Sequence, residues 1–139
     1  EQVKSTYPVV EDSFAGLGPF GGIVSAFRHD PNRAWMTLPC DVPLVDKALL
    51  KELASHRNPG KLATCFYNPA TEFPEPLITI WEPRAYPVLL QFLSQGYSCP
   101  RKVLINSEVE VVKTGQAEKL MNVNTQEERQ RVIDLLRKS

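Results

Sequence analysis

The sequence predicts an α/β fold in one domain, in which helices cover both faces of a sheet. Apolar runs of strand length alternate with amphipathic helical segments along most of the chain. The run at residues 34–38 is almost wholly apolar, which is typical of a strand buried on both faces. The 12 prolines stand at the boundaries of these segments rather than in one linker, so residues 1–139 are expected to form a single domain with short connections.

In the first half of the chain, hydrophobic runs and chain breakers define the elements. The expected order is a strand at 7–10, a glycine-rich turn at 16–22, a helix at 23–28, the strand at 34–38 and a helix from 46 to about 58. Pro31 ends the first helix, because the residue before a proline disfavours the helical conformation. Asp46 can cap the second helix, whose apolar stripe runs from Leu49 to Leu53.

The second half continues the alternation. It predicts strands at 62–67 and 77–81, a helix from about 83 to 95, a short helix at 101–105, a strand at 109–112 and a last helix from 125. Pro83 suits a first helical turn because it lacks an N–H group, and Gly96 suits the position after a helix end. Thr125-Gln-Glu-Glu128 is a capping box. The helix that it opens would bury Val132, Ile133, Leu135 and Leu136.

Charge and composition exclude several classes of partner. The 16 basic and 16 acidic side chains cancel, so no general field draws the chain to nucleic acid or to an anionic membrane. No run of about 18 apolar residues exists to span a bilayer, and no signal peptide is visible. Cys40, Cys65 and Cys99 lack the close spacing of zinc ligands or of a disulfide framework. We therefore expect reduced thiols in a cytoplasmic protein.

The remaining aromatic and titratable residues have structural explanations. Trp35 and Trp81 lie in apolar runs and are expected in the core. His29 and His56 each stand near the end of a predicted helix, where a cation suits the helix dipole.

Asp41 is the strongest candidate for chemistry. It follows the apolar strand directly, and Pro39 and Pro43 restrict the backbone on either side of it. A carboxylate held at the end of a buried strand suits Mg²⁺, which is bound by one or two carboxylates together with substrate phosphates and water. The residues alone leave equally open that Asp41 caps the next helix or closes a turn.

A second candidate is the glycine-rich turn with Gly18, Pro19, Gly21 and Gly22, which opens a helix. Glycines let backbone amides approach a ligand, and a helix start favours anions. The segment matches neither a Walker loop nor the dinucleotide-binding fingerprint, so a plain tight turn is the preferred interpretation of these residues alone. Asp12 follows the first predicted strand and would lie at the same edge of the sheet.

Polar residues later in the chain could also bind a ligand. Asn122 and Asn124 stand two residues apart before the last predicted helix and can project to one side, although such residues more often satisfy backbone groups. Arg101 and Lys102 could bind a phosphate, although one basic pair is more often a solvated surface.

Taken in order, five segments resemble the molybdenum-cofactor guanylyltransferase family. They are Val10-Glu-Asp-Ser13, Gly18-Pro-Phe-Gly-Gly-Ile23, Leu38-Pro-Cys-Asp-Val-Pro-Leu44, Phe73-Pro-Glu-Pro-Leu77 and Met121-Asn-Val-Asn-Thr125. The matches are collinear and cover the chain from about Tyr7 to its end. The segments around Asp41 and Asn122 are the most specific. Related cytidylyltransferases usually differ around the metal-binding carboxylate and after the glycine turn, so the chain is more similar to the guanylyl branch.

The resemblance implies a Rossmann-like three-layer nucleotidyltransferase domain with a mostly parallel mixed sheet. It implies transfer of GMP from GTP to the terminal phosphate of molybdopterin, with release of pyrophosphate and with Mg²⁺ as cofactor. Asp41 would then be the catalytic metal ligand. The nucleotide would be bound by Asp12, Gly18, Pro19, Gly21 and Gly22, and the pterin substrate by Arg101, Asn122 and Asn124.

The chain departs from the family at its beginning. Family members start with a strand and a glycine-rich loop that ends in a lysine, and residues 1–139 correspond to the part that follows. Roughly fifty to sixty residues, with the first strands of the sheet, are therefore expected upstream. The isolated chain is expected to be inactive, and its open sheet edge favours self-association. The alternatives are a degenerate, non-catalytic scaffold or a related nucleotidyltransferase for CTP or a sugar phosphate.

Overall fold

The structure, a computed structural model, describes residues 19–39, 47–115 and 130–134. Its elements in chain order are α2 (Pro19–His29), β1 (Trp35–Pro39), α3 (Lys47–Ser55), β2 (Ala63–Asn68), β3 (Phe73–Trp81), α4 (Ala85–Ser94), α5 (Pro100–Ile105), β4 (Glu110–Val112) and β5 (Gln130–Asp134). The predicted alternation of strands and helices is thus confirmed from α2 to β4. The strand expected at 7–10 and the capping box at 125–128 lie outside the described residues.

The described strands form one mixed sheet in the order β4-β2-β3-β1-β5. β3 pairs antiparallel with β1 and with β2, and β5 pairs antiparallel with β1. Within this part of the chain, only the β2–β4 pair is parallel. The α/β class and the mixed sheet are confirmed, but the expectation that most pairings would be parallel is wrong here. The short connection between β2 and β3 is one reason, because parallel neighbours need a longer crossover.

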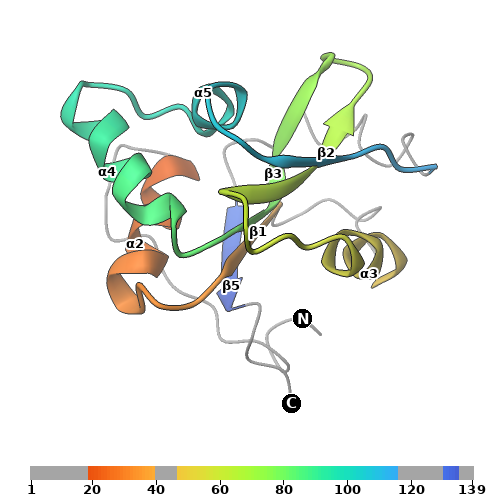
Figure 1. Cartoon of the computed structure of the whole chain (residues 1–139), viewed down its shortest axis with the longest axis horizontal. Coiled ribbons are helices and arrows are strands. Elements are labelled where there is room, and N and C mark those ends of the chain that lie inside the picture. Colours follow the sequence, from red (N-terminus) through yellow and green to blue (C-terminus); the bar gives the residue numbers. More distant parts are fainter. Residues whose placement is uncertain (1–18, 40–46, 116–129, 135–139) are drawn as a thin grey trace.

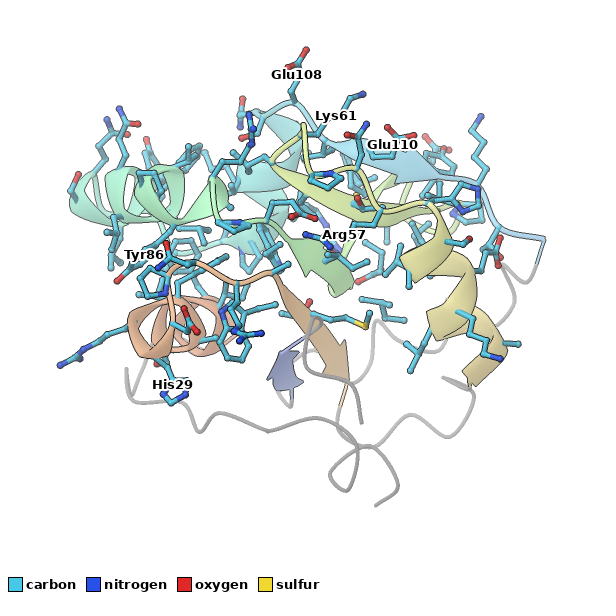
Figure 2. All side chains as sticks on the ribbon, turned by 60° about the horizontal axis from the view of Figure 1, so that its bottom comes forward. His29, Arg57, Lys61, Tyr86, Glu108 and Glu110 are labelled. Atoms are coloured by element: carbon cyan, nitrogen blue, oxygen red, sulfur yellow. The ribbon has the colours of Figure 1, made fainter. Side chains whose placement is uncertain are left out.

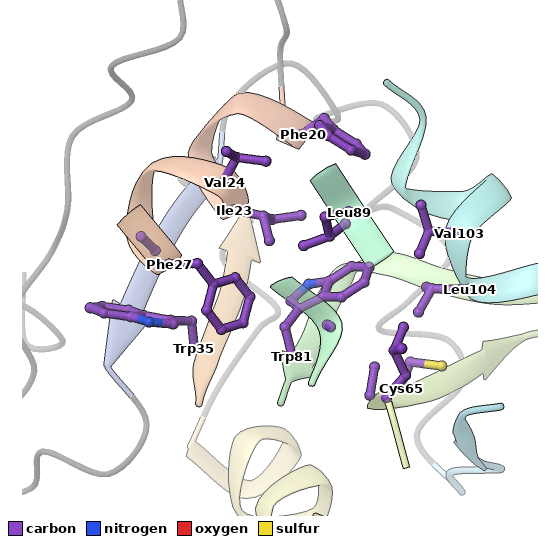
Figure 3. Packing of buried hydrophobic residues seen from close by; sticks show 14 residues of the cluster. Phe20, Ile23, Val24, Phe27, Trp35, Cys65, Trp81, Leu89, Val103 and Leu104 are labelled. Atoms are coloured by element: carbon purple, nitrogen blue, oxygen red, sulfur yellow. The ribbon is translucent and has the colours of Figure 1, made fainter. Parts of the chain in front are cut away.

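Helices cover both faces of this sheet (Figure 1). On one face, Trp35, Cys65 and Trp81 pack in one buried cluster with side chains of α2, α4 and α5 (Figure 3). Because side chains alternate along a strand, Met36 and Ile80 point to the opposite face. α3 covers that face, and its Leu49 and Leu53 are fully buried. The predicted three layers and the two core tryptophans are therefore confirmed.

The end of α4 follows the signal in the sequence. Gly96 has a φ of 88° and follows the C-cap of α4, and the amides of Gly96 and Tyr97 donate to the carbonyls of Leu93 and Phe92. The ring of Tyr97 also contacts that of Phe92, at 6.3 Å between centroids. This arrangement explains why α4 stops where it does.

Both histidines stand at helix ends, as predicted. His29 is the last residue of α2 and points away from the core (Figure 2). The Nδ1 atom of His56 lies 2.9 Å from the carbonyl oxygen of Glu52, in the last turn of α3. A histidine near a carbonyl end of a helix interacts favourably with the dipole.

The last predicted helix is wrong over residues 130–134, which form strand β5 instead. β5 pairs with β1 over five positions, from Trp35 opposite Asp134 to Pro39 opposite Gln130. Val132 and Ile133 are β-branched and suit a strand as well as the buried side of a helix. Backbone hydrogen bonds to β1 therefore decide the conformation against the local helix signal.

Candidate functional site

The carboxyl ends of three strands meet at one edge of the sheet. β1 and β2 both run antiparallel to β3 and hence share a direction, and β4 is parallel to β2. Pro39, Asn68 and Val112 therefore end their strands at the same edge, which we call the carboxyl edge (Figure 1). In α/β sheets, ligands bind beyond the carboxyl ends of the strands. Asp41 follows β1 by two residues in the sequence.

The first turn of α2 lies at the carboxyl edge as well. α2 leads into β1 through a short connection, so the helix runs back along the strand and begins where β1 ends (Figure 1). Gly21 and Gly22 belong to this first turn, because α2 begins at Pro19 rather than after the glycines as predicted. The turn contains no acidic residue, so no carboxylate of its own neutralises the positive end of the helix. Such a helix start suits an anion.

α5 brings Arg101 against the core next to α2. Pro100, Val103 and Leu104 of this helix are buried, and the last two share a cluster with Phe20 of the first α2 turn (Figure 3). The Nε atom of Arg101 is buried and has no hydrogen-bond partner among the residues that the structure describes. A buried donor without a partner costs free energy, and an anionic ligand would satisfy it. The ligand role of Arg101 stays a prediction.

A buried polar network lies where β2 ends and β3 begins. The side-chain amide of Asn68 donates to Glu75 Oε1 at 2.8 Å, and both residues are 0% exposed. Thr79 Oγ1 donates to the Glu75 carbonyl at 2.8 Å, and Thr37 Oγ1 of β1 donates to the Pro76 carbonyl at 3.1 Å. The network therefore connects β1, β2 and β3 at the carboxyl edge. Glu75 was not among the site residues predicted from the sequence, although it lies in the segment 73–77 that carried the resemblance.

Contacts at the end of β4 anchor the start of the following segment. Lys113 Nζ lies 5.5 Å from the centroid of the Tyr67 ring, and Thr114 Oγ1 donates to Glu52 Oε1 of α3 at 2.6 Å. The sequence then runs on to Asn122 and Asn124.

Several predicted site residues lie outside the described ranges. They are Asp12, Gly18, Asp41, Asn122 and Asn124. Within the described ranges, no three His, Cys, Asp or Glu side chains are grouped so that they could hold a metal ion. The Mg²⁺ site thus stays a prediction that depends on Asp41. The described helices also include none that is long and apolar enough to cross a membrane.

Residues 1–111 match the family model of the MobA-like NTP transferase domain. The chain belongs to this family. The bifunctional molybdenum cofactor biosynthesis protein of Synechocystis sp. is 26% identical over 121 residues, which are 87% of this MobA-like chain and 35% of that protein. A probable molybdenum cofactor guanylyltransferase of Flavobacterium johnsoniae is 26% identical over 124 residues, 88% of this chain and 64% of that protein. The MobA-like chain thus spans about a third to two thirds of these relatives.

A solved structure has the same fold. The crystal structure of molybdopterin-guanine dinucleotide biosynthesis protein A from Archaeoglobus fulgidus matches this MobA-like chain with a TM-score of 0.58 and 24% identity. The match covers 82% of this chain and 55% of that structure. The nucleotidyltransferase-like fold predicted from the sequence is therefore confirmed.

Proposed function

We propose that the full-length protein is a molybdenum cofactor guanylyltransferase, which transfers GMP from GTP to the terminal phosphate of molybdopterin and releases pyrophosphate. The observation that carries the proposal is the convergence of the α2 start, the β1 end and α5 on one part of the molecule. The chain belongs to the MobA-like family, and several of its relatives are named molybdenum cofactor guanylyltransferase. Both facts support the same activity.

The proposed reaction needs alignment and charge neutralisation more than it needs a base. The attacking phosphate oxygen is already anionic, so the protein has to hold it in line with the departing pyrophosphate. The start of α2, with Gly21 and Gly22, offers backbone amides to the nucleotide phosphates, and Asp12 and Gly18 would extend this surface. Arg101 offers its Nε, which has no partner among the described residues, to an anionic group of the pterin substrate, and Asn122 and Asn124 would bind the same substrate.

Asp41 would hold Mg²⁺, which supplies positive charge to the crowded phosphates when it is bound. The placement of the β1 end fits this role, because it lies beside the helix start that suits the same phosphates.

Asp41→Asn in the full-length protein tests this function. The substitution removes the metal-binding charge, so we expect GMP transfer to fall by about 100-fold or more while the unfolding temperature stays close to wild type. Glu108→Gln is the matched control, because Glu108 is an exposed carboxylate before β4 and should leave transfer unchanged. Retained turnover in Asp41→Asn would contradict the assignment.

Nucleotide competition separates guanylyl transfer from its alternatives. We propose that GTP displaces a labelled guanine nucleotide far better than CTP does, and CTP preference would favour a cytidylyltransferase instead. Absence of binding by either nucleotide would favour the non-catalytic scaffold. We also propose that self-association uses an outer strand of the described sheet, of which β4 exposes Val111.

A further inference from the structure

Glu75 is a fully buried carboxyl residue that the proposed reaction does not use. It is 0% exposed and lies in β3 between Pro74 and Pro76. Burying a carboxyl group is costly unless hydrogen bonds compensate, so its place in the sheet calls for a specific reason. Asn68 supplies one such bond at 2.8 Å, from the last position of β2.

The backbone around Glu75 departs from regular strand pairing. Cys65 of β2 lies opposite Thr79, but Tyr67, only two positions along, lies opposite Pro74. β3 therefore carries extra residues between these pairs, and Glu75 lies in the resulting bulge. Prolines on both sides of Glu75 suit such a bulge, because they donate no ladder hydrogen bond. Bulges are over-represented beside active sites, where they redirect side chains.

The bulge is held from both neighbouring strands. On the β2 side, the Asn68 amide donates to the Glu75 carboxyl group. On the β1 side, Thr37 Oγ1 donates to the Pro76 carbonyl, at 3.1 Å, and lies 3.3 Å from the Thr79 carbonyl. Thr37 is two residues before the end of β1 at Pro39. The position of the β1 end is thus coupled to the bulge, and the bulge to β2 through Glu75.

We propose that Glu75 is a positioning residue, which fixes the β3 bulge between Asn68 and Thr37 and thereby sets the carboxyl end of β1 for metal binding. This inference rests on the proposed function, because Asp41, which follows β1, is the proposed metal ligand. Glu75 acts through the backbone of β3 and β1 rather than by touching the substrate. Loss of its side chain should therefore weaken metal binding more than it weakens nucleotide binding.

Metal affinity of the full-length protein gives a readout that does not depend on turnover. Mn²⁺ alone is titrated against the protein, and free Mn²⁺ is followed by its electron paramagnetic resonance signal. Loss of Mn²⁺ binding in Asp41→Asn would show that the titration reports the Asp41 site. We expect Glu75→Ala to raise the Mn²⁺ Kd by about 5-fold to 10-fold, which corresponds to about 1 kcal/mol. Glu75→Gln keeps an acceptor for Asn68 and should stay within about 2-fold of wild type.

Two further variants separate positioning from general stability. Leu89→Ala removes a fully buried side chain from the helix-covered core and lowers stability without touching the bulge, so it should leave the Mn²⁺ Kd unchanged. Thr37→Val removes the hydroxyl that donates to the Pro76 carbonyl, and it should raise the Mn²⁺ Kd as Glu75→Ala does. It also replaces Glu75→Ala as the deciding variant if that protein fails to fold.

The outcomes distinguish this inference from the proposed function. An unchanged Mn²⁺ Kd in Glu75→Ala or Thr37→Val overturns the positioning role, as does a loss in Glu75→Gln equal to that in Glu75→Ala. Wild-type protein that binds Mn²⁺ through Asp41 but transfers no GMP overturns the guanylyltransferase assignment and leaves the positioning test valid. A raised Kd in Glu75→Ala and Thr37→Val, with Glu75→Gln and Leu89→Ala near wild type, supports the role.

Discussion

Removal of Arg57 is expected to cost more stability than any other loss of a charged partner among the described residues. The Arg57 guanidinium donates to Glu82 with Nε at 2.7 Å from Oε2 and with Nη2 at 2.8 Å from Oε1. Figure 2 shows Arg57 pointing inward, whereas Lys61 and Glu110 lie at the surface. The Glu82 side chain is 1% exposed and that of Arg57 is 25% exposed. The pair joins the end of α3 to the junction of β3 and α4.

The magnitude follows from what Arg57→Met leaves behind. Glu82 would be left in a buried place without its cation, and breaking a buried pair in this way typically costs about 3–5 kcal/mol. The quarter-exposed guanidinium retains some water in the folded state, so we expect a loss near the lower end, about 3 kcal/mol. With a urea dependence of roughly 2 kcal/mol per molar, the unfolding midpoint would fall by about 1.5 M.

Urea unfolding followed by tryptophan fluorescence measures this change, because Trp35 and Trp81 are both buried. Lys61→Met is the matched control, since Lys61 contacts Glu110 at 3.5 Å on a solvent-exposed surface, and it should shift the midpoint far less. The double variant Arg57→Met with Glu82→Leu should recover much of the loss, because an apolar pair leaves no buried charge. A midpoint for Arg57→Met no lower than that for Lys61→Met would refute the reasoning.

Two further predictions concern thiols and a helix end. Burial, with the charges of Glu75 and Glu110, raises the pKa of Cys65 to about 12, so this thiol should resist alkylation at pH 8 while the exposed Cys99 reacts, as peptide mapping would show. Because the unfolded Cys65 ionises near pH 9, its burial should also lower stability as pH rises from about 9 to 12. Gly96→Ala places a side chain at a φ of 88° and should lower the free energy of unfolding by about 1 kcal/mol in urea titrations. Gly115→Ala, where the added Cβ meets nothing within 4 Å and φ is not in the left-handed region, should be close to neutral, and equal losses at both positions would contradict the backbone explanation.

Local patterns predicted most elements of this fold correctly. The apolar run at 34–38 became β1, an inner strand of the described sheet, and the leucine stripe from Leu49 to Leu53 became the buried side of α3. Gly96 marked the end of α4 because a left-handed backbone conformation favours glycine over other residues. These signals depend on a few neighbouring residues, so they can be recognised without knowledge of the rest of the chain.

The candidate site could be predicted only in part from such local patterns. Short motifs pointed to the start of α2, to the residue after β1 and to Arg101, and the structure brings their elements to one part of the molecule. Glu75 was missed as an individual residue, because a carboxyl group between two prolines is ordinary in an exposed loop. Its burial and its hydrogen bond to Asn68 arise only when β2 and β3 pair with a bulge.

The sequence by itself determined the α/β class, the core tryptophans, the end of α4 and the family resemblance, since each depends on the period or chemistry of adjacent residues. Only the tertiary structure decided that residues 130–134 form β5, that antiparallel pairings dominate the described sheet, and that Glu75 is buried at the carboxyl edge. Strand pairing joins residues far apart in the chain, such as Trp35 and Asp134. Its hydrogen bonds can outweigh a local helix preference, and no short segment of the sequence contains that information.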